Sequence, residues 1–119
     1  ERTNTPLQAL LLMNDPQHVE AARHLGQRML LQGGSTTAER LRFGFRLVTA
    51  RQPNAKEQSI LQQTLDTHLA KYKADAEAAK KLLAVGESPA NATLNPSELA
   101  AYAMVANLLL NLDEVVTKN

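Results

Sequence analysis

The chain has 119 residues, no cysteine and a formal net charge of +1. This length allows one domain with a modest hydrophobic core, and the small net charge argues against a dedicated nucleic-acid binder. The lack of cysteine excludes disulfides, thiolate metal sites, cysteine nucleophiles and covalent c-type haem attachment.

The first two predicted helices both start with a capping residue that is followed by proline. Thr5 and Pro6 begin the first, which we expect to stop near Asn14 because the residue before a proline disfavours helical geometry. Asp15 and Pro16 begin the second, and a pair of glycines should end it. The expected inner face of this second helix consists of Val19, Ala22, Gly26, Met29 and Leu30.

Capping boxes mark the start of the next two helices. Thr36 with Glu39 predicts the third helix, and Asn54 with Glu57 predicts the fourth. Apolar residues then recur at helical spacing, which indicates one buried face on each helix. The residues expected on these faces are Leu41, Phe45 and Val48 in the third helix, and Leu61, Leu65, Leu69 and Tyr72 in the fourth.

The sequence around Asp75 has two interpretations. Asp75 could cap a fifth helix, with Ala79, Leu82 and Leu83 inward and Gly86 at its end. Alternatively, the fourth helix continues through this point, because the neighbouring residues include no strong helix breaker. The sequence leaves both possibilities open.

The segment 95–112 is the one around which we expect the chain to fold. Asn95 is a good N-cap and Pro96 suits the first helical position, and in the rest of the segment only Asn107 and Asn111 are strongly polar after the first turn. A helix that is apolar on most faces is buried. We therefore predict an all-α fold, a small bundle of five or six helices with a buried C-terminal helix.

A buried Asn107 would need a hydrogen-bond partner, because an unpartnered buried amide is destabilising. We expect the partner to come from another segment, and residues 2–8 are the expected source because they carry polar groups in excess of what one helix cap needs. The alternative is that Asn107 faces solvent at a gap in the bundle.

Three blocks of the sequence have a pattern that can be compared with known families. The first block contains RTNTPLQAL at 2–10 and NDPQ at 14–17, the second has Arg51 and Glu57 around a proline, and the third contains VANLLLNLDE at 105–114. These blocks resemble the C-terminal part of an uncharacterised family that is abundant in planctomycetes. Members of this family are large predicted-secreted proteins that often carry a cytochrome c-like domain upstream. The resemblance implies an extracytoplasmic location and a multidomain parent protein, but it implies no reaction.

The histidines do not have metal-binding spacing. His18, His24 and His68 form neither an H-x-x-x-H nor an H-E-x-x-H pattern. We expect them to have surface or half-buried structural roles, and we expect no cofactor to be bound to this chain.

Two groups of polar residues are candidates for an interaction surface. The densest basic group includes Arg42, Arg46 and Arg51, which either form a solvated helix face or dock an acidic partner, another domain or a polyanionic glycan. Arg2, Asn4 and Gln8 form the second group, which either ties the N-terminal segment to the bundle or meets an upstream domain.

These observations favour a non-catalytic interaction or structural module of a secreted bacterial multidomain protein. The length predicts that residues 1–119 form one helical domain. Because the sequence starts at Glu1 rather than Met, we expect it to be part of a longer chain, and the resemblance implies that it is the C-terminal fragment. Its expected partners are upstream domains or a cell-surface protein, with no nucleic acid and no membrane span in this fragment. The alternative function is an accessory part of an upstream redox or carbohydrate-directed enzyme.

Overall fold

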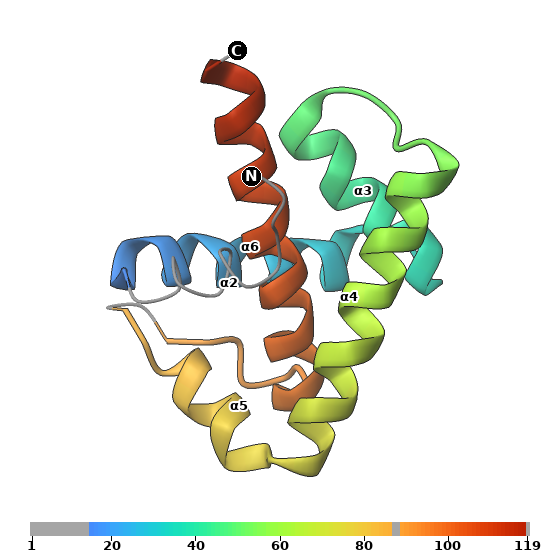
Figure 1. Ribbon diagram of the computed structural model, residues 1–119. Helices are drawn as coiled ribbons and strands as arrows, with labels where there is room; N and C mark the ends of the chain where they lie inside the picture. Colours follow the sequence, from blue (N-terminus) through green and yellow to red (C-terminus); the bar gives the residue numbers. More distant parts are fainter. Residues whose placement is uncertain (1–14, 87–88, 119) are drawn as a thin grey trace.

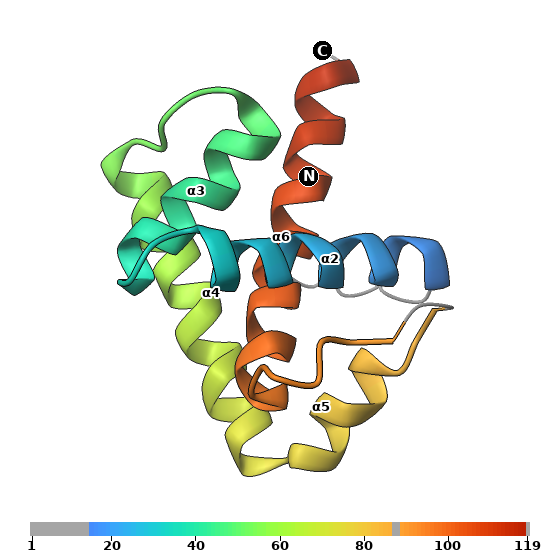
Figure 2. The same cartoon turned by 180° about the vertical axis from the view of Figure 1, so that it is seen from behind.

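The computed structural model describes residues 15–86 and 89–118, and within these ranges the regular structure is entirely helical. Figures 1 and 2 show the helices gathered into one bundle, with principal extents of 36 × 30 × 24 Å. The prediction of an all-α bundle is therefore confirmed. The helices are α2 (Pro16–Gln32), α3 (Thr37–Thr49), α4 (Ala55–Ala74), α5 (Ala76–Leu83) and α6 (Pro96–Lys118). The predicted helix from Thr5 to Asn14 lies outside the described residues.

The helix starts coincide with the capping signals in the sequence. The Asp15 side chain accepts from the Gln17 N–H at the start of α2. Both α3 and α4 have complete capping boxes, in which the cap side chain and the glutamate at the third helical position each accept from the other's backbone N–H. These local bonds satisfy donors that have no partner within the helix, which is why each helix begins where it does.

Asp75 separates α4 from α5, which settles the question that the sequence left open. Its backbone lies at φ −136° and ψ 81°, outside the helical region, and its side chain accepts from the Ala78 N–H. Ala79 and Leu83 then face the core, whereas Leu82 is half-buried. α5 ends at Leu83, before Gly86, whose φ of +100° is the left-handed region that glycine tolerates.

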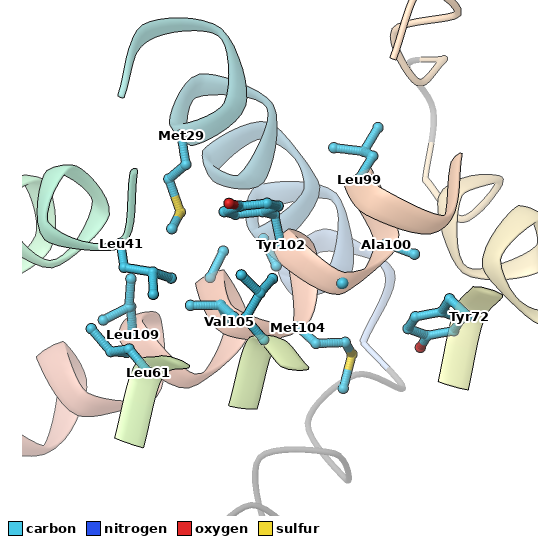
Figure 3. Close-up of a cluster of buried hydrophobic side chains, with 14 of the residues drawn as sticks. Met29, Leu41, Leu61, Tyr72, Leu99, Ala100, Tyr102, Met104, Val105 and Leu109 are labelled. Atoms are coloured by element: carbon cyan, nitrogen blue, oxygen red, sulfur yellow. The ribbon is translucent and has the colours of Figure 1, made fainter. Parts of the chain in front are cut away.

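Helix α6 lies at the centre of the bundle and contacts the other four helices, as Figures 1 and 2 show. Its residues 99–107 are all buried, as is Leu109, so the predicted burial of this helix is confirmed. Figure 3 shows Leu109 and Val105 close to Leu41 of α3 and Leu61 of α4. Burial ends toward the C-terminus, where Leu112 is 38% exposed.

The remaining inward-facing predictions are mostly confirmed. Val19, Ala22 and Met29 are buried in α2, as are Leu41 and Phe45 in α3. Leu61, Leu65 and Tyr72 are buried in α4. One member of each predicted stripe is only half-buried: Leu30 in α2, Val48 in α3 and Leu69 in α4.

Gly26 allows α2 and α6 to approach closely. A Cβ atom built on Gly26 would lie 3.0 Å from the Ala103 nitrogen and 3.1 Å from the Tyr102 carbonyl carbon. Both atoms belong to the backbone of α6, so no side-chain rotation would relieve the contact. The glycine therefore sets the distance between the two helices.

Within the described part of the chain, none of the helices has the length and apolar character needed to cross a membrane.

Candidate interaction surface

A polar hollow of about 310 Å³ lies at the turn between the end of α2 and the start of α3, and we call it the α2–α3 notch. It forms because α2 ends at Gln32 and the chain turns through Gly33 and Gly34 before Thr36 caps α3. Gly34 has a φ of +116°, a conformation that favours glycine. The notch is lined by Gln32, Gly33, Gly34, Glu39, Arg42, Phe43, Arg46 and Gln52.

Arg42 and Arg46 are the basic side chains of the notch. They are exposed and lie one turn apart on α3. Among the described residues, no carboxylate lies within ion-pair distance of either guanidinium group. The structure therefore brings together two of the arginines that the sequence singled out and leaves their charges facing solvent.

Glu39 is the acidic member of the notch, but its carboxylate already has a role in the fold. Its Oε1 accepts from the backbone N–H groups of Ser35 and Thr36 at 2.9 and 3.2 Å. These hydrogen bonds, together with the nearby Arg42 charge, hold the pKa of Glu39 below its usual value. Glu39 thus remains ionised and anchors the start of α3.

Gln32 is held in place at another side of the notch. Its Oε1 accepts from Nε and Nη2 of Arg28, each at 3.3 Å. The Arg28 guanidinium lies 5.9 Å from the centre of the Phe43 ring, a cation–π distance. Arg28 therefore links two lining residues without lining the notch itself.

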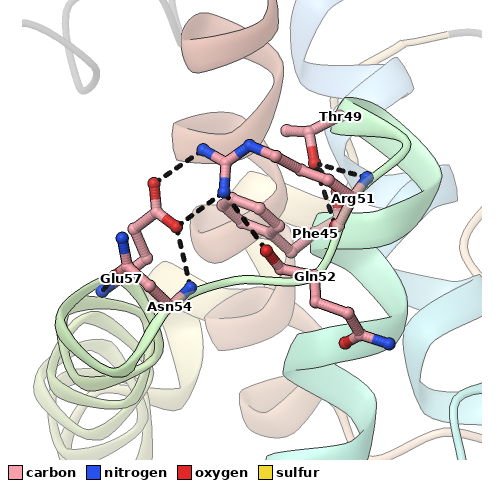
Figure 4. A network of polar contacts seen from close by, with 6 residues as sticks. All are labelled: Phe45, Thr49, Arg51, Gln52, Asn54 and Glu57. Atoms are coloured by element: carbon pink, nitrogen blue, oxygen red, sulfur yellow. Dashed lines mark hydrogen bonds and ion pairs between the residues drawn. The ribbon is translucent and has the colours of Figure 1, made fainter.

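Arg51 has a different environment from Arg42 and Arg46, as Figure 4 shows. Its two terminal nitrogens donate to the two carboxylate oxygens of Glu57 at 3.0 and 2.8 Å. The guanidinium also lies 4.9 Å from the centre of the Phe45 ring. This bidentate pair lowers the pKa of Glu57 to about 2, with the Asn54 N–H adding to the effect. Arg51 thus connects the end of α3 to the start of α4.

The other predicted interaction residues, Arg2, Asn4 and Gln8, lie outside the described residues. Their assignment stays a prediction, as does the involvement of Arg51 in binding.

Arg23 has a structural role that the sequence did not reveal. It is 1% exposed, and its Nη1 donates to the carbonyl oxygens of Leu83 and Val85 at 2.9 and 3.0 Å. Its Nη2 lies 3.5 Å from the Glu20 carboxylate. Arg23 thereby binds carbonyl groups at the C-terminal end of α5, where backbone acceptors have no partner within the helix. A sequence signal existed, because Arg23 lies one turn after Val19 and one before Gly26 on the inner face.

Asn107 is completely buried, and a histidine of α2 is one of its partners. The Asn107 Oδ1 and His18 Nε2 atoms lie 2.5 Å apart. The prediction that another segment binds this amide is confirmed. The expected source, residues 2–8, lies outside the described residues, whereas the observed bond comes from position 18.

The other two histidines also have local structural contacts. His24 lies 4.0 Å from Glu20, and His68 stacks on Tyr72 with its pKa lowered by burial and by the Lys71 charge. In the described part of the chain, no group of three or more His, Asp or Glu side chains is arranged to hold a metal ion.

A larger hollow of about 590 Å³ lies between α5 and the segment 89–96. Its lining is mainly apolar, with Lys80 and Asn91 as the long polar side chains. The Asn91 Oδ1 already accepts from both the backbone and the hydroxyl of Thr93. This hollow therefore offers less charge for recognition than the α2–α3 notch.

A family model described as "PSD1: Protein of unknown function (DUF1553)" matches residues 1–65. The match includes α2, α3 and the first half of α4, and so contains all lining residues of the notch and the Arg51–Glu57 pair. No curated protein and no solved structure matches the chain significantly.

Proposed function

This chain belongs to the PSD1 (DUF1553) family, whose function is unknown, and from that premise we propose that it is a non-catalytic interaction module of a larger protein. The module would hold its parent protein to a neighbouring domain or to a cell-surface protein. We further propose an extracytoplasmic location in a multidomain bacterial protein, following the resemblance of the sequence blocks at both ends of the chain.

The observation that carries this proposal is that some polar side chains stabilise the fold, whereas others are exposed to solvent at the notch. Glu39 and Glu57 cap helices, Arg23 binds the end of α5, and His18 binds Asn107. Glutamate, arginine and histidine side chains often act in catalysis, but these four side chains stabilise the fold.

Arg42 and Arg46 are used differently, because their charges remain open to solvent at the notch. A guanidinium stays protonated at any physiological pH, so it recognises anions rather than transferring protons. The module thus presents a recognition surface on a fold in which Arg23 and Asn107, its fully buried polar side chains among the described residues, are engaged in structural contacts.

The test is an association experiment between this chain and the part of the parent protein that precedes it, produced as a separate polypeptide. Isothermal titration calorimetry should detect saturable binding of one chain to one partner. The Leu109→Ala variant, in which a core side chain is truncated, should bind less because fewer molecules are folded. No binding at concentrations near millimolar would contradict the proposal, and a catalytic activity that appears only on mixing would favour the accessory-enzyme alternative.

A further inference from the structure

We propose that the α2–α3 notch binds an acidic polypeptide segment, with a glutamate or aspartate carboxylate seated between Arg42 and Arg46. This inference rests on the proposed interaction role and names the chemistry of the partner. The observation behind it is the placement of two guanidinium groups one turn apart in a hollow, where no carboxylate of the described residues lies within ion-pair distance of either group.

The donors of the notch match a carboxylate. A guanidinium presents its N–H groups as a planar fork that fits the two oxygens of a carboxylate. Gln32 adds a further donor, because its amide oxygen is already occupied by Arg28 and the hydrogen-bonding capacity that remains lies on its NH₂ group. An anion entering the notch would therefore meet more donors than acceptors.

The volume of the notch limits the size of what enters it. At about 30 Å³ per water molecule, a hollow of 310 Å³ holds on the order of ten waters. This is the scale of one or two amino-acid side chains. A peptide could thus place an acidic side chain in the notch while its backbone crosses the exposed surface of α3.

Glu39 makes an acidic peptide a better match than a densely charged polyanion. The notch contains two guanidinium charges and one carboxylate, and hydrogen bonds and Arg42 keep that carboxylate ionised. Arg46 lies seven residues after Glu39, roughly 10 Å along the helix axis. A single carboxylate between the two arginines can lie on the Arg46 side, away from Glu39, whereas some of several closely spaced sulfate or phosphate groups would lie near Glu39 and be repelled by it.

The experiment uses the 119-residue chain and a fluorescein-labelled octapeptide with two central glutamates in a glycine–serine background. The control peptide has glutamines at these two positions. Fluorescence anisotropy should show binding of the glutamate peptide about tenfold tighter than the glutamine peptide, because exposed charge pairs each contribute modestly. The difference should shrink in high salt. Backbone amide shifts in ¹⁵N NMR spectra should move mainly within residues 32–46.

Two double variants locate the site. Arg42→Gln with Arg46→Gln should abolish the preference for the glutamate peptide. Lys56→Gln with Lys73→Gln removes the same charge from exposed positions on α4 and should retain the preference. Matching thermal melts for both variants would show that the fold is unchanged.

The inference would be overturned by equal affinity for the two peptides, by equal effects of the two double variants, or by shifts outside the notch. Tighter binding of a heparin tetrasaccharide at the notch would also overturn it, in favour of a sulfated glycan. If the chain binds its parent protein and the arginine variant does so equally well, the interaction role stands and only the assignment of the notch fails.

Discussion

Two polar side chains are fully buried among the described residues, Arg23 and Asn107, and each binds a group from a different helix or helix end. Arg23 connects α2 to the end of α5, and Asn107 connects α6 to His18 of α2. A buried polar group that finds its partner adds little net stability but makes other arrangements costly. Both residues thus favour one packing of α2 over its alternatives.

Asn107→Leu and Asn111→Leu should have different effects on stability, although both asparagines lie on the same side of α6. Asn107→Leu leaves His18 without its amide partner and should cost about 1–3 kcal/mol. The Asn111 amide is enclosed without a hydrogen-bond partner among the described residues, so Asn111→Leu should be neutral or stabilising. Chemical unfolding of the two variants measures the difference, and equal destabilisation would contradict the assignment.

Arg23→Met should be strongly destabilising. The methionine retains much of the apolar stem but leaves the Leu83 and Val85 carbonyls and the Glu20 carboxylate without this partner. Removing one member of a buried charged network typically costs about 3–5 kcal/mol. Arg28→Met, at an exposed position of the same helix, serves as the control and should change the unfolding free energy much less. Similar unfolding midpoints for both variants would show that the Arg23 contacts are not important for stability.

At the scale of the helices, the residues at which helices begin were predicted well from the sequence, because a helix cap involves only residues close together in the chain. The residues that cap α3 and α4 and their glutamate partners are three positions apart, so the sequence contains the whole interaction. The break at Asp75 was less predictable. The lysine- and alanine-rich residues around Asp75 have a high helix propensity, so local propensity does not explain the break. The packing of α5 against α6 favours it.

The Glu57 carboxylate at the start of α4 should make the free energy of unfolding depend on pH in the acidic range. The pKa of Glu57 is lowered from 4.5 to about 2 in the folded chain, so its contribution is complete above pH 4.5 and is lost as the pH falls toward 2. Glu57→Gln removes this contribution. The stability difference between the two proteins should therefore shrink as the pH falls through that window.

Urea unfolding at a series of pH values measures this effect of Glu57. Glu77→Gln is a suitable control, since Glu77 also lies in the first turn of a helix but has no arginine bound to it among the described residues. A constant difference between wild type and Glu57→Gln from pH 5 to pH 2 would contradict the prediction. The pair is partly exposed, so high salt should weaken the effect.

Gly26→Ala should destabilise the contact between α2 and α6. Alanine is the better helix former by about 1 kcal/mol, so propensity alone predicts stabilisation. The new methyl group would press on the backbone of Tyr102 and Ala103, and overpacking typically costs about 1–3 kcal/mol. The Cβ of Gly44→Ala would instead meet the flexible side chain of Met29, so this control should cost less. A lower unfolding midpoint for Gly44→Ala than for Gly26→Ala would contradict this account.

At the scale of the whole molecule, the sequence predicted which helix is central but not how the others are placed around it. The apolar run of α6 requires burial on most sides, and that requirement is visible in one segment. The notch could not be predicted from one segment, because its lining includes Gln52 from the turn after α3 and Gln32 from the end of α2. Likewise, the basic residues near Arg42 looked equivalent until the structure paired Arg51 with Glu57.

The central position of α6 predicts that Leu109→Ala is among the most damaging single substitutions in the core. Leu109 is completely buried, and Figure 3 places it beside Leu41 and Leu61, so its truncation weakens the packing between α6, α3 and α4. Truncating a buried leucine typically costs about 2–5 kcal/mol, a large fraction of the stability of a small domain.

Leu94→Ala is the matched control for Leu109→Ala, because it removes the same atoms from a half-buried position in the segment before α6. It should cost clearly less, since less apolar surface returns to water and the neighbouring chain can close the space. Urea unfolding followed by circular dichroism would give both free energies. Equal midpoints would mean that stability does not depend on the packing around α6, and the central role of this helix would then have to be abandoned.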